Sequence, residues 1–428
     1  MKITLLNHAS VLIELGPMRL LTDPWYFGYP FAEGWGLVYD NPRALEVAAT
    51  ATHLWVSHFH GDHLNRPTLS ALVKLNSRMR VFACDSANFQ MSPVFRSLGF
   101  PDVVSMQECR PYDEGGIELR RFPATGIDNT LSIRGDGATI VNYNDCNLPA
   151  ASIRHMRSEL GPITLLLNNY NNAGKILRFP LPPAERIISE QRELFRKVAD
   201  AFEAKIVIPF ASMHYYRAEE TAAQNASLMG PETLSAAAGR LVPLAVGQTA
   251  AIDAGLNVEV TGAPAPPAPR STIARPESVD VDELLRQASE FSGRVRRGYF
   301  GLSMLLPSVF IHVTDLGRTM QLSPRSASWV NSRAAQMEAH SSALRTWFTA
   351  RYGTDSFVVG AHLALVDEHL TALRFLILLA MLGESQMDFV SLIRSLRHRN
   401  GWSFWWNRRH EIWGVVSHLG FSVEESRL

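Results

Sequence analysis

The densest group of side chains able to do chemistry lies in the run His58-Phe-His-Gly-Asp-His63. Imidazole nitrogens and carboxylate oxygens are ligands for zinc, iron and manganese. The His-x-His spacing of His58 and His60 puts two imidazoles on one side, and Asp62 with His63 can serve a second position. Burying four such groups without a cation would require many compensating partners. We therefore expect this run, called the metal loop below, to bind a divalent ion.

A strand before the metal loop and a helix after it are predicted to hold the loop in place. Residues 54–57 have the length of a buried strand, and Asn65 ahead of Pro67 is typical of a helix N-cap. Apolar residues have helical spacing over 190–204, and a strand follows at 205–209. Alternating strands and helices predict a layered α/β domain. Turn residues, including a Gly-Asp-Gly hairpin signal at 135–137, separate further predicted strands at 3–6, 11–15, 19–22, 81–84, 117–122, 131–133, 138–143 and 163–168.

The composition limits the partners and the compartment. The chain has 428 residues, 46% of them apolar, which is enough for a sizeable core and more than one domain. Lys and Arg number 41 and so do Asp and Glu, so no overall field steers the chain onto nucleic acid or an anionic membrane. Three cysteines, Cys84, Cys109 and Cys146, favour a reducing compartment. Because residues 1–6 begin a strand-like pattern without a secretory signal, we expect a cytoplasmic protein.

A proline-rich segment separates two parts of different character. Residues 262–269 read Gly-Ala-Pro-Ala-Pro-Pro-Ala-Pro, which favours a linker or an extended surface segment. We expect a metal-binding domain over 1–262, a linker over 263–280 and a mostly helical α+β accessory region over 281–428. The apolar run 370–382 contains an arginine and is too short to span a bilayer, so it predicts a buried or interface helix. The accessory region is expected to cap the pocket or to form a homodimer contact.

His-x-His-x-Asp-His is the signature of the metallo-β-lactamase superfamily, and the resemblance implies an αββα sandwich over roughly residues 1 to 260. The flanking residues resemble the metallo-β-lactamase-like part of CMP-N-acetylneuraminate hydroxylase and its bacterial relatives. That resemblance rests on Leu21-Thr-Asp-Pro-Trp25, on Gly28, Phe31, Gly34 and Trp35, on Pro67-Thr-Leu69, on Asn144-Asp-Cys146 and on Ile208-Pro-Phe-Ala211.

The resemblance implies that later strands supply further metal ligands. In the superfamily a bridging aspartate ends a strand, and Asp145 after the predicted strand 138–143 fits that place. A turn-forming aspartate is the alternative for this residue. The last histidine of the superfamily follows a late strand. His214, after 205–209, is the candidate, with a surface histidine as the alternative.

One ligand of the superfamily has no counterpart, because no histidine occurs between His63 and Asp145. Thr125 or Asp128 is expected in its place. The carboxylate of Asp128 is a harder ligand that suits iron or manganese as well as zinc. Since the position served by the first two histidines of the metal loop is thereby weakened, we expect a single ion or an unequal pair.

Two residues near the N-terminus are expected close to the metal loop. His8 matches a histidine near the site of related lactonases and phosphodiesterases, which implies an active-site role; a buried, hydrogen-bonded histidine is the alternative. Asp23, before Pro24, is expected to support the loop from behind. The aromatic stretch 25–35 is expected to pack in the core or to wall the pocket.

The leading interpretation is a metal-dependent hydrolase of an ester, lactone, amide or phosphodiester of a small molecule. A divalent ion such as zinc lowers the pKa of bound water, and Asp62 or Asp128 can take the proton. An iron-dependent oxygenase or oxidase is the alternative, suggested by the hydroxylase resemblance and the missing histidine. No cysteine is followed two residues later by histidine, so the chain lacks Rieske-type ligands and an electron donor would act in trans. A non-catalytic metal-binding scaffold is a second alternative.

Overall fold

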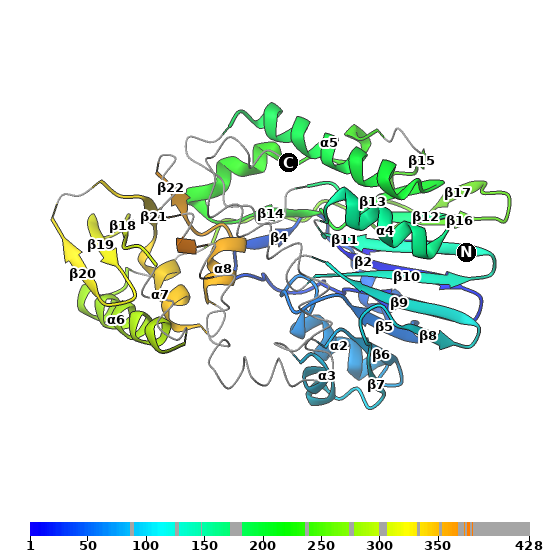
Figure 1. Cartoon of the computed structure of the whole chain (residues 1–428), viewed down its shortest axis with the longest axis horizontal. Helices are drawn as coiled ribbons and strands as arrows, with labels where there is room; N and C mark the ends of the chain where they lie inside the picture. The colour runs from blue at the N-terminus through cyan, green and yellow to red at the C-terminus, as the bar shows by residue number, and fades with distance from the viewer. Residues whose placement is uncertain are drawn as a thin grey trace.

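Two large β-sheets face each other between layers of helices, and a smaller sheet with its own helices lies at one end (Figure 1). The computed structural model describes residues 1–85, 90–124, 128–146, 148–171, 182–235, 239–273, 278–298, 306–331, 334–350 and 353–366, together with Ala372, Phe375, Leu376 and Leu379.

The first sheet has eight strands in the order β17-β16-β1-β2-β3-β5-β6-β7. Strands β3, β5, β6 and β7 run parallel to one another. Parallel strands are covered on both faces and therefore read as continuous apolar runs, as Leu54-Trp-Val56 does. The bounds are β1 (Lys2–Asn7), β2 (Ser10–Leu15), β3 (Met18–Thr22), β5 (His53–Val56), β6 (Arg80–Ala83), β7 (Val103–Ser105), β16 (Thr249–Ile252) and β17 (Val258–Thr261).

The second sheet has seven strands in the order β15-β13-β12-β11-β10-β9-β8. The predicted hairpin joins β10 to β11: Asp136 and Gly137 both have positive φ, at 46° and 73°, as the tight turn requires. The bounds are β8 (Pro111–Glu114), β9 (Ile117–Pro123), β10 (Asn129–Gly135), β11 (Ala138–Asn144), β12 (Leu165–Asn169), β13 (Ile206–Phe210) and β15 (Arg240–Leu241).

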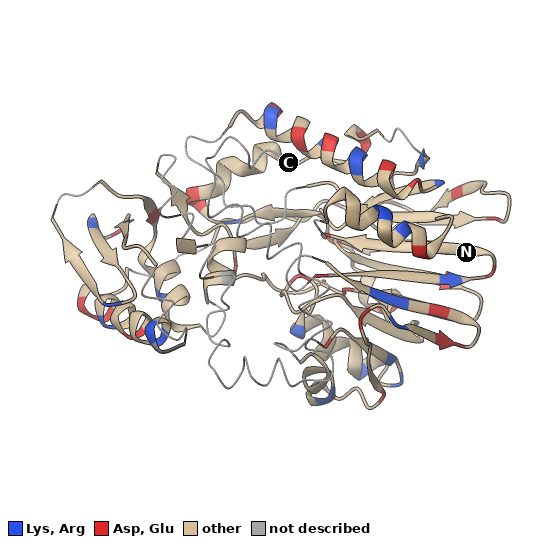
Figure 2. Cartoon of the chain, in the orientation of Figure 1, with Lys and Arg blue, Asp and Glu red and all other residues tan. Residues whose placement is uncertain are grey.

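Helices cover the outer face of each sheet and complete the expected αββα sandwich (Figure 1). α1 (Ala44–Ala48), α2 (Arg66–Leu75) and α3 (Ser92–Leu98) lie on the first sheet, and α4 (Ala150–Leu160) and α5 (Ala184–Phe202) on the second. Helix α5 begins six residues before its predicted start. It buries Phe195 and Phe202, and acidic and basic residues alternate along it (Figure 2).

The proline-rich segment is held along the surface of the sandwich. Asp40 N donates to Pro266 O at 3.0 Å, and Ala268 N donates to Val38 O at 2.8 Å. Further along, Ile273 N donates to Arg217 O at 3.1 Å. Over the residues described, the segment is thus extended and hydrogen-bonded to the domain, in keeping with a surface segment.

The described part of the accessory region is an α+β unit with a separate core. Its sheet has the order β20-β19-β18-β21-β22, and β18 pairs parallel with β21. The bounds are α6 (Val281–Gly298), β18 (Val309–Val313), β19 (Arg318–Leu322), β20 (Ala327–Val330), β21 (Met337–Ala339), α7 (Ser341–Thr349), α8 (Gly353–Val359) and β22 (Ala364–Leu365).

Two expectations for this region need comment. The apolar stretch 357–365 alone predicts some strand in this region, but its first residues end α8 and only Ala364–Leu365 pairs as β22. The apolar run 370–382 lies largely outside the described residues; Ala372, Phe375, Leu376 and Leu379 are helical and buried. Among the helices whose placement is described, none combines the length and apolarity needed to cross a bilayer.

Asn65 links the metal loop to α2, as its predicted role as N-cap requires. Its Oδ1 accepts from Thr68 N at 3.0 Å, and its Nδ2 donates to Gly61 O at 3.0 Å. We predict that Asn65→Ala lowers the free energy of unfolding of the metal-free protein by about 1–2 kcal/mol, measured by urea denaturation. Asn65→Asp keeps the acceptor for Thr68 N and should lose less. Equal losses in both variants would contradict the capping role.

Candidate metal centre

The candidate metal centre lies at one end of the sandwich, where several parallel strands of both sheets end. Asp23 follows β3, and Ser57 with the metal loop follows β5. From the second sheet, Asp145 follows β11 and His214 follows β13. The carboxyl ends of parallel strands form the usual place for a ligand in α/β proteins.

Three side chains form an outer group that is partly open to solvent: His58, His60 and Asp128. Their ligand atoms all lie within 4.8 Å of one another. His58 Nε2 is 2.8 Å from His60 Nδ1 and 3.6 Å from Asp128 Oδ1. The Asp128 side chain is 20% exposed, whereas His58 is buried. The carboxylate considered in place of the missing histidine thus lies beside the first two histidines; Thr125 is outside the described residues.

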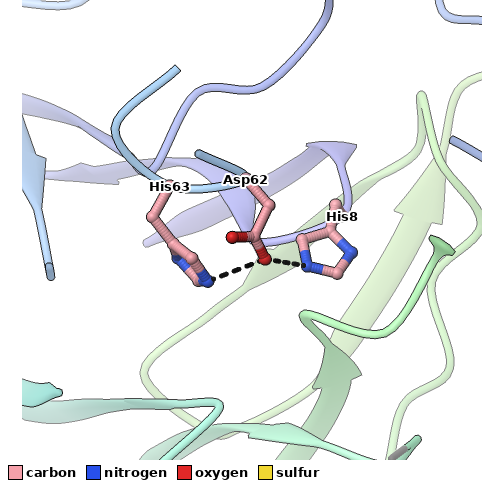
Figure 3. A group of neighbouring side chains, drawn as sticks. All are labelled: His8, Asp62 and His63. Atoms are coloured by element: carbon pink, nitrogen blue, oxygen red, sulfur yellow. Dashed lines mark ion pairs between the residues drawn. The ribbon is translucent and has the colours of Figure 1, made fainter. Parts of the chain in front are cut away.

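A second, inner group is fully buried and consists of His8, Asp62 and His63. Asp62 Oδ2 lies 3.2 Å from His63 Nε2 and 3.3 Å from His8 Nε2. Figure 3 shows the carboxylate of Asp62 between the two imidazoles. His8, expected near the site from its resemblance, therefore contacts the metal loop directly.

Asp145 lies between the two groups. Its Oδ2 is 3.4 Å from His63 Nε2, and together with His58 and His63 it forms a third group within the same 4.8 Å limit. This is the placement expected of a bridging carboxylate, because the residue reaches one histidine of each group.

His214 lies beside the inner group and outside the three groups of close ligand atoms. Its ring stacks on Trp35, with centroids 3.8 Å apart and planes 13° from parallel, and its centroid is 5.5 Å from that of His8. The residue is buried. His214 therefore lies beside the candidate ligands, next to His8, and its expected role as the last metal ligand stays a prediction.

Several buried polar atoms at the centre lack a hydrogen-bond partner among the described residues: Asp62 Oδ1, Asp145 Oδ1 and both ring nitrogens of His214. Leaving buried polar atoms unpaired is costly, so such atoms are rare in folded proteins. These atoms are imidazole nitrogens and carboxylate oxygens of the same centre, and both kinds of atom are ligands for a divalent ion such as zinc or iron.

The electrostatics of the centre favour the ligand forms that bind metals. Burial, together with the neighbouring His63, lowers the pKa of His58 well below its usual value, and burial lowers the pKa of His214 to about 3. Burial tends to raise the pKa of Asp62 and Asp145, but interaction with His63 holds both pKa values below the ordinary range.

His63 is the exception among the histidines. Burial tends to lower its pKa, but the carboxylates of Asp62, Asp145 and Asp23 raise the pKa well above its usual value. Its proton compensates for these negative charges. A bound metal ion would displace that proton, because metal ligation requires the neutral imidazole.

Asp23 supports the metal loop through a network that the sequence only partly indicated. Its Oδ1 accepts from Ser57 N at 2.8 Å and from Ser57 Oγ at 3.1 Å, and its Oδ2 lies 3.4 Å from His63 Nδ1. Ser57 Oγ in turn lies 2.9 Å from His58 Nδ1. Ser57 was not singled out from the sequence, because a serine at a strand end has no distinctive pattern.

No family model matches the sequence. The CMP-N-acetylneuraminic acid hydroxylase of Pan troglodytes is 42% identical over 233 residues, covering 49% of this chain and 38% of that protein. The chain thus spans well under half the length of this relative.

Two solved structures are also similar. CmlA, a diiron β-hydroxylase from Streptomyces venezuelae, is 20% identical, with a TM-score of 0.37 over 53% of this chain and 46% of its own. The isothiocyanate hydrolase from Delia radicum gut bacteria is 14% identical, with a TM-score of 0.42 over 59% of this chain and 100% of its own.

The sequence is similar to that of CMP-N-acetylneuraminic acid hydroxylases over about half of this chain. The two facing sheets between helical layers, with the metal loop at one end, have the architecture of the metallo-β-lactamase fold.

Proposed function

We propose that the chain is an iron-dependent oxygenase or oxidase of a small molecule. The outer group carries the proposal, because His58, His60 and Asp128 supply two imidazoles and one carboxylate. That ligand set with open positions is typical of non-haem iron(II) oxygenases. The similarity to hydroxylases over about half of the chain supports the same choice. A bound iron(II) ion would supply the redox chemistry that the side chains lack.

The residues of the two groups have different tasks in this proposal. His58, His60 and Asp128 bind the reactive ion where it meets the substrate, because Asp128 is partly exposed. Asp62 and His63 hold the inner position away from solvent, with Asp145 shared between the two. His8 and His214 complete the inner side.

Two carboxylate oxygens of the centre are open to a bound ion. Asp62 Oδ1 has no hydrogen-bond partner among the described residues, while Asp62 Oδ2 is fixed between His8 and His63. Because its pKa is lowered, the Asp62 carboxylate stays anionic, and its open oxygen can bind an ion while the other is held by the two histidines. Asp145 Oδ1 is open in the same sense.

The electrons for oxygenation would come from a group outside residues 1–428, because these residues lack cysteine–histidine pairs spaced for a Rieske cluster.

Hydrolysis is the second candidate, and one observation favours it. Two histidines and a carboxylate also bind zinc in hydrolases such as thermolysin, and the open oxygen of Asp62 can accept a hydrogen bond from a water molecule at the centre. In that case zinc would lower the pKa of the attacking water.

Metal analysis separates the candidates. We predict that the full chain purified without oxygen retains iron, and that its absorption spectrum changes on exposure to air. With a chemical reductant it should also consume dioxygen. Zinc as the retained metal, with turnover of esters or lactones, would instead assign hydrolysis. Failure to retain any metal, with stability unaffected by a chelator, would leave only a non-catalytic scaffold.

Asp128 tests the outer position directly. We predict that Asp128→His, which supplies the histidine usual in the superfamily, lowers iron occupancy and dioxygen consumption at least tenfold and raises zinc occupancy, because imidazole is the softer ligand. The measurement is metal content and oxygen uptake of the purified variants. Asp128→Glu keeps the carboxylate and is the matched control. Unchanged iron binding in the histidine variant would refute the role of Asp128.

Asp23 is predicted to act through the metal loop. Asp23→Asn removes the charge that orients Ser57 and His63, and we expect metal affinity to fall by about 10- to 100-fold, measured by competition with a chelator. Asp136→Asn makes the same change in the exposed hairpin turn and should leave affinity unchanged. Equal affinities in the two variants would show that Asp23 has no such role.

A further inference from the structure

We infer that the accessory region positions the metal-site histidines through two aromatic residues of the sandwich, Phe31 and Trp35. The segment that does so is 359–362, called the clasp below, which links α8 to β22. The inference rests on the proposed function, since it assigns a task to residues that hold the metal ligands in place. The clasp residues themselves lie outside the three groups of candidate ligands.

Trp35 determines where the ring of His214 lies. The indole is 1% exposed and stacks on the imidazole at 3.8 Å. Neither ring nitrogen of His214 has a hydrogen-bond partner among the described residues, so no polar contact there fixes the ring. The remaining aromatic contacts, edge-on to Tyr216 at 5.4 Å and to His8 at 5.5 Å, act together with this stacking.

The clasp holds Trp35 by a hydrogen bond across most of the chain. Trp35 Nε1 donates to Val359 O at 2.8 Å, and the two residues are 324 positions apart. Buried indole N–H groups almost always have a partner, because leaving one unpaired is costly. The accessory region thus supplies the one acceptor that the indole uses.

Phe31 likewise contacts both a candidate metal ligand, His60 of the outer group, and a residue of the clasp. Its ring meets His60 edge-on, with centroids 5.5 Å apart, and its ring also packs on Trp35 at 4.8 Å. Phe31 O lies 2.7 Å from His362 Nε2, which must donate because a carbonyl oxygen only accepts. His60 and His214 therefore each have one aromatic neighbour that is hydrogen-bonded to the clasp.

The contact between the clasp and the aromatic residues is tight. A Cβ on Gly34 would lie 2.4 Å from Gly360 O, and a Cβ on Gly360 would lie 2.6 Å from Phe31 O. Only glycine allows two backbones to approach this closely. Ala361 has a φ of 56°, and its carbonyl oxygen accepts from Thr221 Oγ1 at 2.6 Å. A displaced clasp would therefore displace Phe31 and Trp35 as well.

The role assigned here is positioning, which predicts an effect on the geometry and affinity of metal binding. Full-length Gly360→Ala should push the clasp away from Phe31, and Trp35→Phe should keep a ring beside His214 but lose the bond to Val359. Gly317→Ala is the control, because it adds a methyl group and backbone strain in the same region but meets nothing within 4 Å of the Cβ.

Cobalt(II) titration of the metal-free proteins measures both the affinity of metal binding and, through the visible spectrum, the geometry of the ligands. We expect Gly360→Ala and Trp35→Phe to bind cobalt about tenfold or more weakly, with a shifted visible spectrum, while Gly317→Ala matches the unmodified chain. If Gly360→Ala does not fold, Trp35→Phe decides. Unchanged affinity and spectrum in the clasp variants would overturn the inference.

His60→Ala and His214→Ala separate this inference from the proposed function. If these two variants bind cobalt as the unmodified chain does, the proposed metal role of the histidines fails. If they bind it weakly while the clasp variants do not, only the role of the clasp fails.

Discussion

The buried carboxylate of Asp23 is the interaction on which the rest of the centre depends. It follows β3 of the first sheet, receives both donors of Ser57 after β5, and accepts from Asn144 Nδ2, at the end of β11 in the second sheet, at 2.6 Å. A carboxylate removed from water is tolerated only when it is paired and hydrogen-bonded. The position of the metal loop is thereby tied to the packing of the two sheets.

Three residues around that carboxylate have a positive φ. His8, Asp23 and Asn144 have φ values of 26°, 37° and 61°, a region that residues with a Cβ rarely adopt. All three contribute side chains to the centre or to its support. Strained residues of this kind persist where the surrounding packing enforces them, and they are common at functional sites. The strained backbone of these three residues is therefore consistent with a functional site at this end of the sandwich.

The sequence was informative where local patterns determine structure. The Asn65 cap, the hairpin at Asp136-Gly137 and the order of strands and helices follow from short stretches whose side chains act on their own backbone. The dense metal loop was equally visible. By contrast, the stacking of Trp35 on His214 joins residues from β4 (Trp35–Leu37) and β14 (His214–Tyr216), and the clasp joins residues 324 apart. Such contacts depend on tertiary packing, which no periodicity records.

Asp128 shows how one residue changes the balance between the two chemistries. An imidazole is a neutral ligand, whereas the carboxylate of Asp128 adds a negative charge beside the one that Asp145 shares between the groups. Anionic ligands reduce the power of a cation to acidify water, which hydrolysis requires, and they stabilise its more oxidised states, which oxygen chemistry requires. Under the proposed function, a carboxylate in place of the histidine would shift the site toward oxygen chemistry and would keep a ligand beside His58, since Asp128 Oδ1 lies 3.6 Å from His58 Nε2.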